Sequence, residues 1–272
     1  MKKVAFIGAG NMNASIIKGL IKQGIDGQDI IVANPSAEKR LALADALGIK
    51  QTASNLDAAR YADFIVLGVK PHLINDVCQE ISQALDISTK CFLSVAAGCT
   101  ISQMKKVLGE NIAIIRTMPN TPTQLGLGMT GMFACPSVSN EQCDYADQLM
   151  AAAGETVWVD KETQIDDITS ISGSGPAYFF LFMEAMQQQA KAAGFSEAVS
   201  RKLVQQTALG AANMVVCNAE LEISELRNNV TSKGGTTQAA LTTLIDGGLT
   251  PLVGRAVAAA LNRAKEISQQ NS

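Results

Sequence analysis

The chain has 272 residues, of which 47% are hydrophobic and 17% charged, with a net charge of −3. This composition provides the apolar side chains for one or two packed domains and argues against an intrinsically disordered chain. No basic block marks a nucleic acid-binding surface, and no run of about 18 apolar residues marks a membrane span. One histidine, His72, and six cysteines without a Cys-x-x-Cys pair predict no metal site. The N-terminal apolar stretch lacks the cleavage site of a signal peptide, so we expect a cytoplasmic protein.

Residues 1–160 alternate short, continuously apolar segments with helical segments, which is typical of parallel strands covered on both faces. Strands are expected at residues 3–7, 30–33, 64–68, 91–95, 111–116, 129–134 and 156–159. Helices are expected between them at residues 12–23, 37–47, 56–61, 73–85, 101–108 and 141–153. The sequence therefore predicts an α/β fold whose N-terminal domain is a Rossmann-like doubly wound sheet.

Residues 161–272 contain no further strand pattern and predict an all-helical C-terminal domain. Helices are expected at residues 176–193, 197–218, 223–228, 237–246 and 251–267, the last one opened by Thr250 as cap and Pro251 at the first helical position. Two of these helices are apolar almost all round, so their polar faces are too narrow for surface helices. We therefore expect this domain to form an obligate homodimer.

The first chemical motif, Gly8-Ala9-Gly10-Asn11-Met12, directly follows the first predicted strand and opens a helix. In this context a Gly-x-Gly pair predicts a tight turn that brings backbone amides and a helix N-terminus to a pyrophosphate. Asn13 stands where the usual third glycine lies, which leaves the close packing of helix on strand open.

The end of the second strand favours NADPH over NADH. Enzymes that use NAD usually carry an acidic residue there, to bind the adenine ribose, but this chain has Asn34 and Ser36, followed by Lys39 and Arg40. Neutral and cationic groups accept a 2′-phosphate that a carboxylate would repel. The alternative is that Ser36 only caps the next helix and the two cations are solvated.

Three further motifs follow predicted strand ends, where loops of an open sheet line the ligand crevice. Gly68-Val69-Lys70-Pro71-His72 is expected to line it, and Val95-Ala96-Ala97-Gly98 is expected to line the same crevice with small residues. Met118-Pro119-Asn120-Thr121-Pro122 is either a rigid loop beside the nicotinamide or a structural turn. We interpret His72 as an ordinary surface residue rather than a proton donor.

Two clusters of small residues open helices in the second half. Ser172-Gly173-Ser174-Gly175-Pro176 precedes an aromatic helix, and Ser232-Lys233-Gly234-Gly235-Thr236-Thr237 precedes another. Amides and hydroxyls at a helix N-terminus suit a carboxylate, so the pair indicates a small anionic substrate. Helix capping alone would explain either cluster.

With these motifs, the chain resembles the pyrroline-5-carboxylate reductases from end to end. The resemblance is carried by Gly8-Ala9-Gly10-Asn11-Met12, Val69-Lys70-Pro71, Ala96-Ala97-Gly98, Met118-Pro119-Asn120-Thr121-Pro122, Ser172-Gly173-Ser174-Gly175-Pro176-Ala177-Tyr178 and Gly234-Gly235-Thr236-Thr237. It departs from the family at Lys233, where a proline is common, and at residues 220–226, which lack a His-Pro-Gly-like sequence. Both departures bear on the rigidity of the loop.

The resemblance implies reduction of L-1-pyrroline-5-carboxylate to L-proline, the last step of proline biosynthesis, by hydride transfer from NADPH, with NADH as the alternative. It also implies a homodimer, often assembled into larger rings. Together with Ser36, the implied cofactor-binding residues are Ile7, Gly8, Ala9, Gly10, Asn11, Met12, Asn34, Asn55, Gly68, Val69, Lys70, Pro71, Val95, Ala96 and Ala97. The implied substrate-binding residues are Glu162, Asn229, Thr236 and Thr237, with Thr237 as the catalytic residue that hydrogen-bonds the ring nitrogen or carboxylate.

Two alternatives to this assignment are a related dehydrogenase and a protein that binds NADPH without catalysis. A β-hydroxyacid dehydrogenase of the 6-phosphogluconate dehydrogenase type needs a helix lysine followed four positions later by asparagine. The lysines at 191, 202 and 233 are followed at that spacing by Phe195, Gln206 and Thr237, so this alternative fails. A non-catalytic protein that senses NADPH remains open, and consumption of NADPH with the imine separates it from the reductase.

Overall fold

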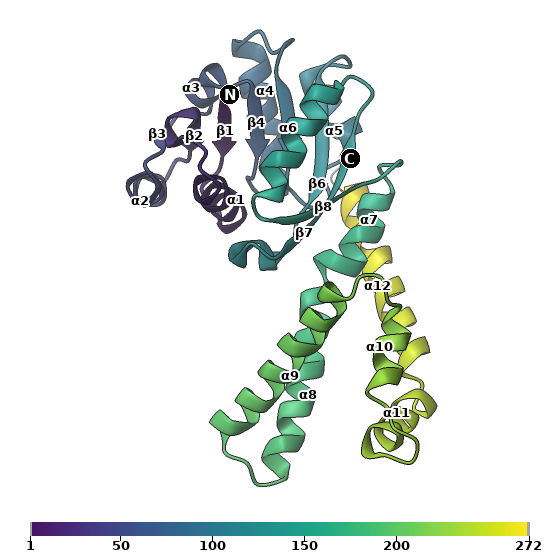
Figure 1. Cartoon of the computed structure of the whole chain (residues 1–272). Helices are drawn as coiled ribbons and strands as arrows, with labels where there is room; N and C mark the ends of the chain where they lie inside the picture. The colour runs from purple at the N-terminus through teal and green to yellow at the C-terminus, as the bar shows by residue number, and fades with distance from the viewer. Residues whose placement is uncertain (1, 271–272) are drawn as a thin grey trace. The chain divides into compact units, whose positions relative to one another are not determined.

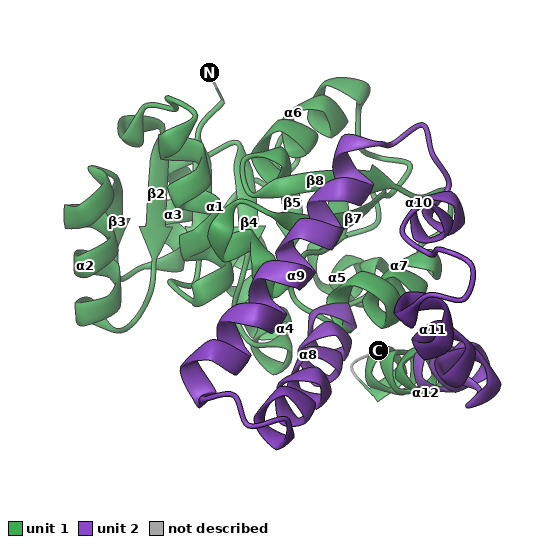
Figure 2. Ribbon diagram, turned by 60° about the horizontal axis from the view of Figure 1, so that its bottom comes forward, with its two compact units in different colours: residues 1–174, 259–272 green, residues 175–258 purple. Residues whose placement is uncertain are grey.

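The computed structural model describes residues 2–270 of the chain (Figure 1). It divides into two compact units, one formed by residues up to 174 and from 259 onward, the other by residues 175–258 (Figure 2).

The first unit contains a single eight-stranded sheet with the strand order β3-β2-β1-β4-β5-β6-β7-β8. Neighbouring strands are parallel except for β6 and β7, which are antiparallel. The strands are β1 Val4–Ile7, β2 Ile30–Ala33, β3 Lys50–Thr52, β4 Phe64–Leu67, β5 Cys91–Ser94, β6 Ala113–Met118, β7 Gly128–Ala134 and β8 Gly154–Trp158. All seven predicted strands are present. Strand β3 was not predicted, because its three residues are polar and it lies at the edge of the sheet.

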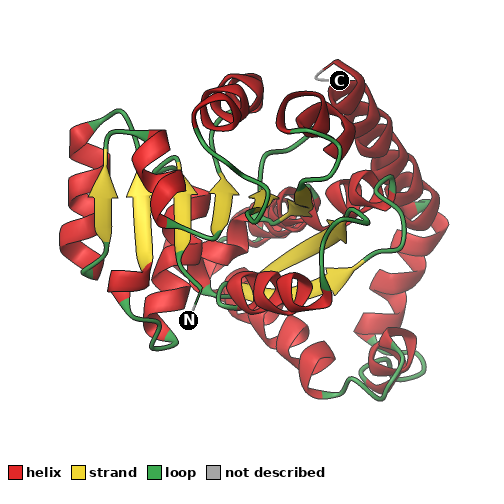
Figure 3. Ribbon diagram, turned by 90° about the horizontal axis from the view of Figure 1, so that it is seen from above, coloured by secondary structure: helices red, strands yellow, loops and turns green. Residues whose placement is uncertain are grey.

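Helices cover both faces of this sheet (Figure 3), as a doubly wound fold requires. One apolar core joins the sheet to α3 Asn55–Tyr61, α4 Ile74–Ala84 and α5 Ile101–Leu108. The other core joins the opposite face to α1 Asn11–Lys22, α2 Ala37–Leu47 and α6 Asn140–Ala151. The strands β1, β2, β4 and β5 are buried along their whole length, which explains their continuous apolar sequences. The predicted Rossmann-like fold is confirmed.

Short helical turns complete the first unit. Three are 3₁₀ turns, η1 Gly27–Asp29, η2 Pro71–Leu73 and η3 Thr121–Leu125. The segment after β8 forms α7 Gln164–Ile168 and continues into a π-helical turn, η4 Thr169–Gly173. Neither α7 nor the π turn was predicted, because five-residue elements carry too little periodicity.

The second unit is helical, as predicted. It holds α8 Gly175–Ala192, α9 Glu197–Cys217, α10 Ile223–Asn229 and α11 Thr236–Asp246, with α8 and α9 packed side by side (Figure 1). Helix α12 Leu249–Gln270 begins in this unit and ends in the first one. The prediction that Thr250 caps this helix was wrong. The amide of Leu252 donates to the carbonyl of Gly248 (3.0 Å), so the helix already includes Leu249 and Thr250 lies in its first turn.

Among residues 2–270, no single helix is long and apolar enough to cross a membrane. The pair α11 and α12, taken together, is long and apolar enough, but the two helices are bent by 52° at their junction. This finding concerns length and composition alone.

Candidate dinucleotide site

The predicted crevice lies where strand order reverses direction. From β1 the chain proceeds to β2 and β3 on one side, and then returns to place β4, β5 and β6 on the other. In such sheets, ligands bind outside the carboxyl ends of the strands at this switch point. Because β2, β1, β4, β5 and β6 are parallel, the loops that follow them meet at one edge. The predicted dinucleotide-binding residues belong to these loops or adjoin them, except Asn55, which begins α3 after β3, a strand that is also parallel to β2 and ends at the same edge.

The glycine loop is tightly packed against the end of β4. Gly8 adopts φ +101°, and a Cβ there would lie 2.8 Å from the carbonyl oxygen of Gly68. Gly10 is the N-cap residue of α1, and no side chain caps this helix. The amides of Asn11 and Met12 therefore begin a helix whose positive dipole end is available to an anion. The geometry fits the pyrophosphate of a dinucleotide.

Asn13 replaces the third glycine by taking over its packing position. Its side chain is buried, and Nδ2 donates to the carbonyls of Ile7 (3.2 Å) and Gly8 (2.8 Å). The carboxamide lies so close to Gly68 that a Cβ on that glycine would overlap it. Helix and strand therefore pack closely here, with the glycine supplied by Gly68, directly after β4, rather than by α1.

Asn34 ties the end of β2 to the glycine loop. Its Oδ1 accepts a hydrogen bond from the amide of Ala9 (3.2 Å), and its Nδ2 donates to the carbonyl of Ser36 (3.3 Å). The guanidinium of Arg40 donates to the carbonyls of Asn34 (3.2 Å) and Pro35 (3.1 Å). Ser36 is exposed at the N-cap of α2, where its side chain makes no capping hydrogen bond. A neutral, partly cationic surface therefore stands where an acidic residue would bind a ribose.

Two other predicted loops are fixed to neighbouring strands. The amide of Val95 donates to the carbonyl of Leu67 (3.1 Å), and Ala96 donates to Oγ of Ser94 (3.3 Å). In the loop after β4, Lys70 is exposed and precedes the 3₁₀ turn η2. Asn55, at the start of α3, donates to Oε2 of Glu80 on α4 (2.9 Å) instead.

The loop after β6 is held by Asn120, a role the sequence reading missed. Its side chain is 9% exposed; Nδ2 donates to the carbonyl of Ser172 in the π turn (2.9 Å), and Oδ1 accepts from the amide of Met129 (2.9 Å). Its carbonyl accepts from Oγ1 of Thr123. The loop with two prolines is thus anchored to both β7 and the π turn, which favours the rigid-loop interpretation.

Arg116 is a second residue that the sequence reading missed. It is 3% exposed and pairs with Glu162 (Nη1–Oε1 3.2 Å) and Asp166 (Nη2–Oδ1 2.7 Å). An arginine in the apolar run before Met118 was the available signal, because a buried guanidinium requires carboxylate partners.

The predicted substrate residues fall in both units. Glu162 lies in the first unit, and its Oε1 is bound by Arg116 and by the amide of Ile101 (2.8 Å). Asn229 ends α10, whereas Thr236 and Thr237 begin α11; all three are exposed in the second unit. His72 is exposed in the turn η2.

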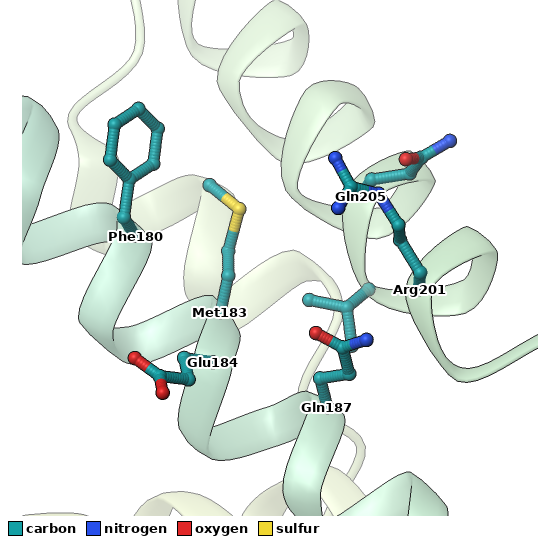
Figure 4. A pocket seen from close by; sticks show the side chains of 7 residues that line it. Phe180, Met183, Glu184, Gln187, Arg201 and Gln205 are labelled. Atoms are coloured by element: carbon teal, nitrogen blue, oxygen red, sulfur yellow. The ribbon is translucent and has the colours of Figure 1, made fainter. Parts of the chain in front are cut away.

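The second unit also contains a hollow of about 170 Å³ between α8 and α9 (Figure 4). Its walls mix apolar and polar side chains, and none was a predicted site residue. The lining residues are Phe180, Met183, Glu184, Gln187, Arg201, Val204 and Gln205.

Four of the six cysteines, Cys78, Cys91, Cys99 and Cys135, are buried as free thiols. Burial raises the pKa of Cys78 and of Cys91 to about 12, so these thiols stay protonated near neutral pH. They act as small apolar core residues. Among residues 2–270, no group of three or more His, Cys, Asp or Glu side chains is placed to hold a metal ion.

A doubly wound sheet, a glycine loop at its switch point and small-residue loops at the same edge together define a dinucleotide-dependent oxidoreductase. A family model described as NADP oxidoreductase coenzyme F420-dependent matches residues 3–98, and one described as pyrroline-5-carboxylate reductase dimerisation matches residues 162–267. The pyrroline-5-carboxylate reductase of Vibrio alginolyticus is 48% identical over 98% of this chain and 98% of its own length. The chain therefore belongs to the pyrroline-5-carboxylate reductase family, which confirms the resemblance.

Solved structures agree with this assignment. A pyrroline-5-carboxylate reductase from Coxiella burnetii superposes with a TM-score of 0.95 at 42% identity, covering 98% of both chains. The Plasmodium falciparum pyrroline carboxylate reductase with NADP bound gives a TM-score of 0.85 at 29% identity, again covering 98% of both.

Proposed function

We propose that the chain reduces L-1-pyrroline-5-carboxylate to L-proline, the last step of proline biosynthesis, with hydride from NADPH. The observation that carries the proposal is a glycine loop in which Gly8 packs closely on Gly68 at the end of β4, in a chain that is 48% identical to a pyrroline-5-carboxylate reductase over 98% of its length. We assign dinucleotide binding to residues 1–160, and substrate binding and dimerisation to residues 161–272. The family matches at 3–98 and 162–267 support this division.

The chemistry asks little of titratable side chains. The reduced nicotinamide supplies the hydride, and a protonated cyclic imine is already a strong electrophile. The residues of the chain then have to bind and orient the two reactants, so that the donor and acceptor carbons lie within about 3–3.5 Å. A single histidine, His72, located in an exposed turn, is consistent with such a mechanism.

We assign the substrate carboxylate to the start of α11. Gly235 is the N-cap residue there, no side chain caps the helix, and Thr236 and Thr237 are its first two residues. Amides at the positive end of an 11-residue helix, with two hydroxyls beside them, suit a carboxylate. Thr237 is the residue we expect to hydrogen-bond the ring nitrogen or carboxylate. Asn229, at the end of α10, is the predicted third contact in this unit.

The preference for NADPH over NADH is assigned to Ser36 and Lys39. Both are exposed at the start of α2, where the helix dipole also favours a phosphate. Arg40 is engaged with two carbonyls and with Oε1 of Gln51 (2.8 Å), so it shapes the loop. An Asn34→Asp variant is expected to raise KM for NADPH about tenfold, by charge repulsion, with a smaller effect on NADH.

We propose that the active form is a homodimer made through residues 161–272, with larger rings as a further level of assembly. The matched dimerisation family covers most of this segment. Its helices carry exposed apolar side chains of a kind that obligate interfaces bury, among them Phe179 (69% exposed), Phe180 (64%) and Leu181 (68%). Free, buried thiols agree with a reducing compartment, so we assign the enzyme to the cytoplasm.

The deciding experiment is NADPH oxidation with L-1-pyrroline-5-carboxylate, comparing Thr237→Val with Thr243→Val. Thr243 is also exposed on α11, but its hydroxyl donates to the helix carbonyl of Ala239 (3.1 Å), so it serves as the matched control. Loss of one hydrogen bond to a charged substrate predicts a fall in kcat/KM of about 10–100-fold for Thr237→Val only. Binding of NADPH without any turnover would instead support the non-catalytic sensor.

A further inference from the structure

Arg116 is a buried cation at the carboxyl end of β6, and its two carboxylate partners lead to different parts of the first unit. Its Nη2 binds Asp166 Oδ1 (2.7 Å), and its Nη1 binds Glu162 Oε1 (3.2 Å). Glu162 precedes α7 and Asp166 belongs to it, and the substrate carboxylate is assigned to α11 rather than to this pair. Removing either carboxylate would leave charge of the guanidinium buried without a partner, which destabilises the fold. Each carboxylate also makes a second contact, and this contact differs between the two.

Glu162 connects the end of β6 to the start of α5. The same Oε1 atom that binds Arg116 also accepts a hydrogen bond from the amide of Ile101 (2.8 Å). Ile101 is the first residue of α5, so the carboxylate lies at the positive end of that helix, where a negative charge is stabilised. The side chain of Glu162 is 26% exposed.

The two elements joined by Glu162 carry the two loops at the β5 and β6 end of the crevice. Residues 95–100 connect β5 to α5, and residues 119–122 follow β6. The strands themselves are joined next to these loops, because Thr117 Oγ1 donates to the carbonyl of Ser94 (2.9 Å). Glu162 provides the second connection at the far end of the 95–100 loop. With both ends tied to β6, that loop has a fixed position relative to the loop after β6.

We propose that Glu162, together with Arg116, is a positioning residue that holds the 95–100 loop in place for the nicotinamide half of NADPH. The proposal rests on the proposed function, since it assumes that these loops bind the dinucleotide. It gives Glu162 a positioning role in addition to the substrate contact that the resemblance implies, since its Oε1 accepts from both Arg116 and the amide of Ile101.

Asp166 provides an internal comparison. Its Oδ1 accepts from Arg116 and from Oγ of Ser268 (3.1 Å) near the end of α12. Asp166 therefore shares the buried cation with Glu162 but connects it to α12 instead of α5. Loss of its charge is expected to lower stability without moving the 95–100 loop.

The test measures the NADPH dissociation constant of the full chain by fluorescence titration without imine. The melting temperature and the KM values for NADPH and for the imine are measured alongside it. Glu162→Ala should raise the NADPH dissociation constant about tenfold, and Glu162→Gln, whose amide oxygen can still accept from Ile101, should restore most of the affinity. Asp166→Asn should lower the melting temperature and leave NADPH affinity within about twofold.

A second pair of variants tests the link without disturbing the ion pair. Ile101→Pro removes the amide that Glu162 accepts, at a first helical position where proline is tolerated, and Ile101→Val keeps it. The proline variant should weaken NADPH binding as Glu162→Ala does, and the valine variant should not. The proposal is overturned if Glu162→Ala raises only the KM for the imine, or if Asp166→Asn weakens NADPH binding equally. Failure of the unmodified chain to bind NADPH would instead contradict the proposed function itself.

Discussion

Replacing Asn13 and Gly68 by alanine, singly and together, perturbs one contact between α1 and the end of β4. Asn13→Ala removes donors to the carbonyls of Ile7 and Gly8. The Ile7 carbonyl keeps the hydrogen bond from the amide of Gly68 (2.9 Å), so the unsatisfied group is the carbonyl of Gly8. One buried acceptor without a donor costs about 1–3 kcal/mol of stability.

Gly68→Ala fails for a different reason. The backbone at Gly68 is not in the left-handed region, so alanine is allowed there, but its Cβ would overlap the Asn13 carboxamide. Overpacking of this kind costs about 1–3 kcal/mol. When Asn13 is also alanine, the methyl group enters the space that the carboxamide leaves. The double variant should therefore be more stable than the sum of the single effects predicts, by about 1–2 kcal/mol.

The assay is urea unfolding of the full chain at one fixed protein concentration, because the stability of an oligomer depends on concentration. The control cycle pairs Asn13→Ala with Gly210→Ala in α9, where a Cβ would meet no atom within 4 Å. That control should be additive. If the Asn13 and Gly68 pair is also additive within about 0.5 kcal/mol, the account of the missing third glycine is refuted.

Three other predictions concern the β6 loop, the pH dependence and the dimer. Asn120→Asp replaces the donor to the Ser172 carbonyl by an acceptor, and should lower the free energy of unfolding in urea by about 1–3 kcal/mol. An unchanged unfolding midpoint would show that this hydrogen bond does not hold the loop. Burial raises the pKa of Tyr145 to about 12, above its unfolded value near 10, so stability present below pH 10 should decline as pH rises from about 10 to 12. Tyr145→Phe should make that decline shallower, and an identical slope would contradict the assignment. Phe180→Glu should yield monomers in sedimentation analysis. Leu41→Glu, at another exposed apolar position on α2, should leave the oligomer intact. Dissociation by both variants would contradict the placement of the dimer interface in residues 161–272.

Strands with continuous apolar sequence were predictable because burial on both faces leaves no room for polar residues. Val4–Ile7 and Phe64–Leu67 are of this kind, and both were located to within one residue. The strand Lys50–Thr52 was not predictable in this way, because its sequence is polar and only its pairing with β2 at the sheet edge makes it a strand. The glycine loop was identified from local sequence, since a turn of this type is encoded within a few residues.

The contacts that complete the site were not predictable, because their partners are distant in the sequence. The packing role of Asn13 in α1 depends on Gly68, which directly follows β4 and lies 55 residues later in the chain. Arg116 pairs with carboxylates 46 and 50 residues away, and periodicity carries no information about such pairs. Glu162 was named through the family resemblance as a substrate contact, which stays a prediction; its bonds to Arg116 and Ile101 became visible only in the fold.

A crystal structure of the chain with bound NADPH tests the central claim most directly. The account predicts the pyrophosphate at the amides of the Gly8–Met12 loop, with the nicotinamide directed toward residues 95–98 and 118–122 at the carboxyl ends of β5 and β6. A dinucleotide bound away from the Gly8–Met12 loop, or with its nicotinamide directed toward β2 and β3, would contradict it.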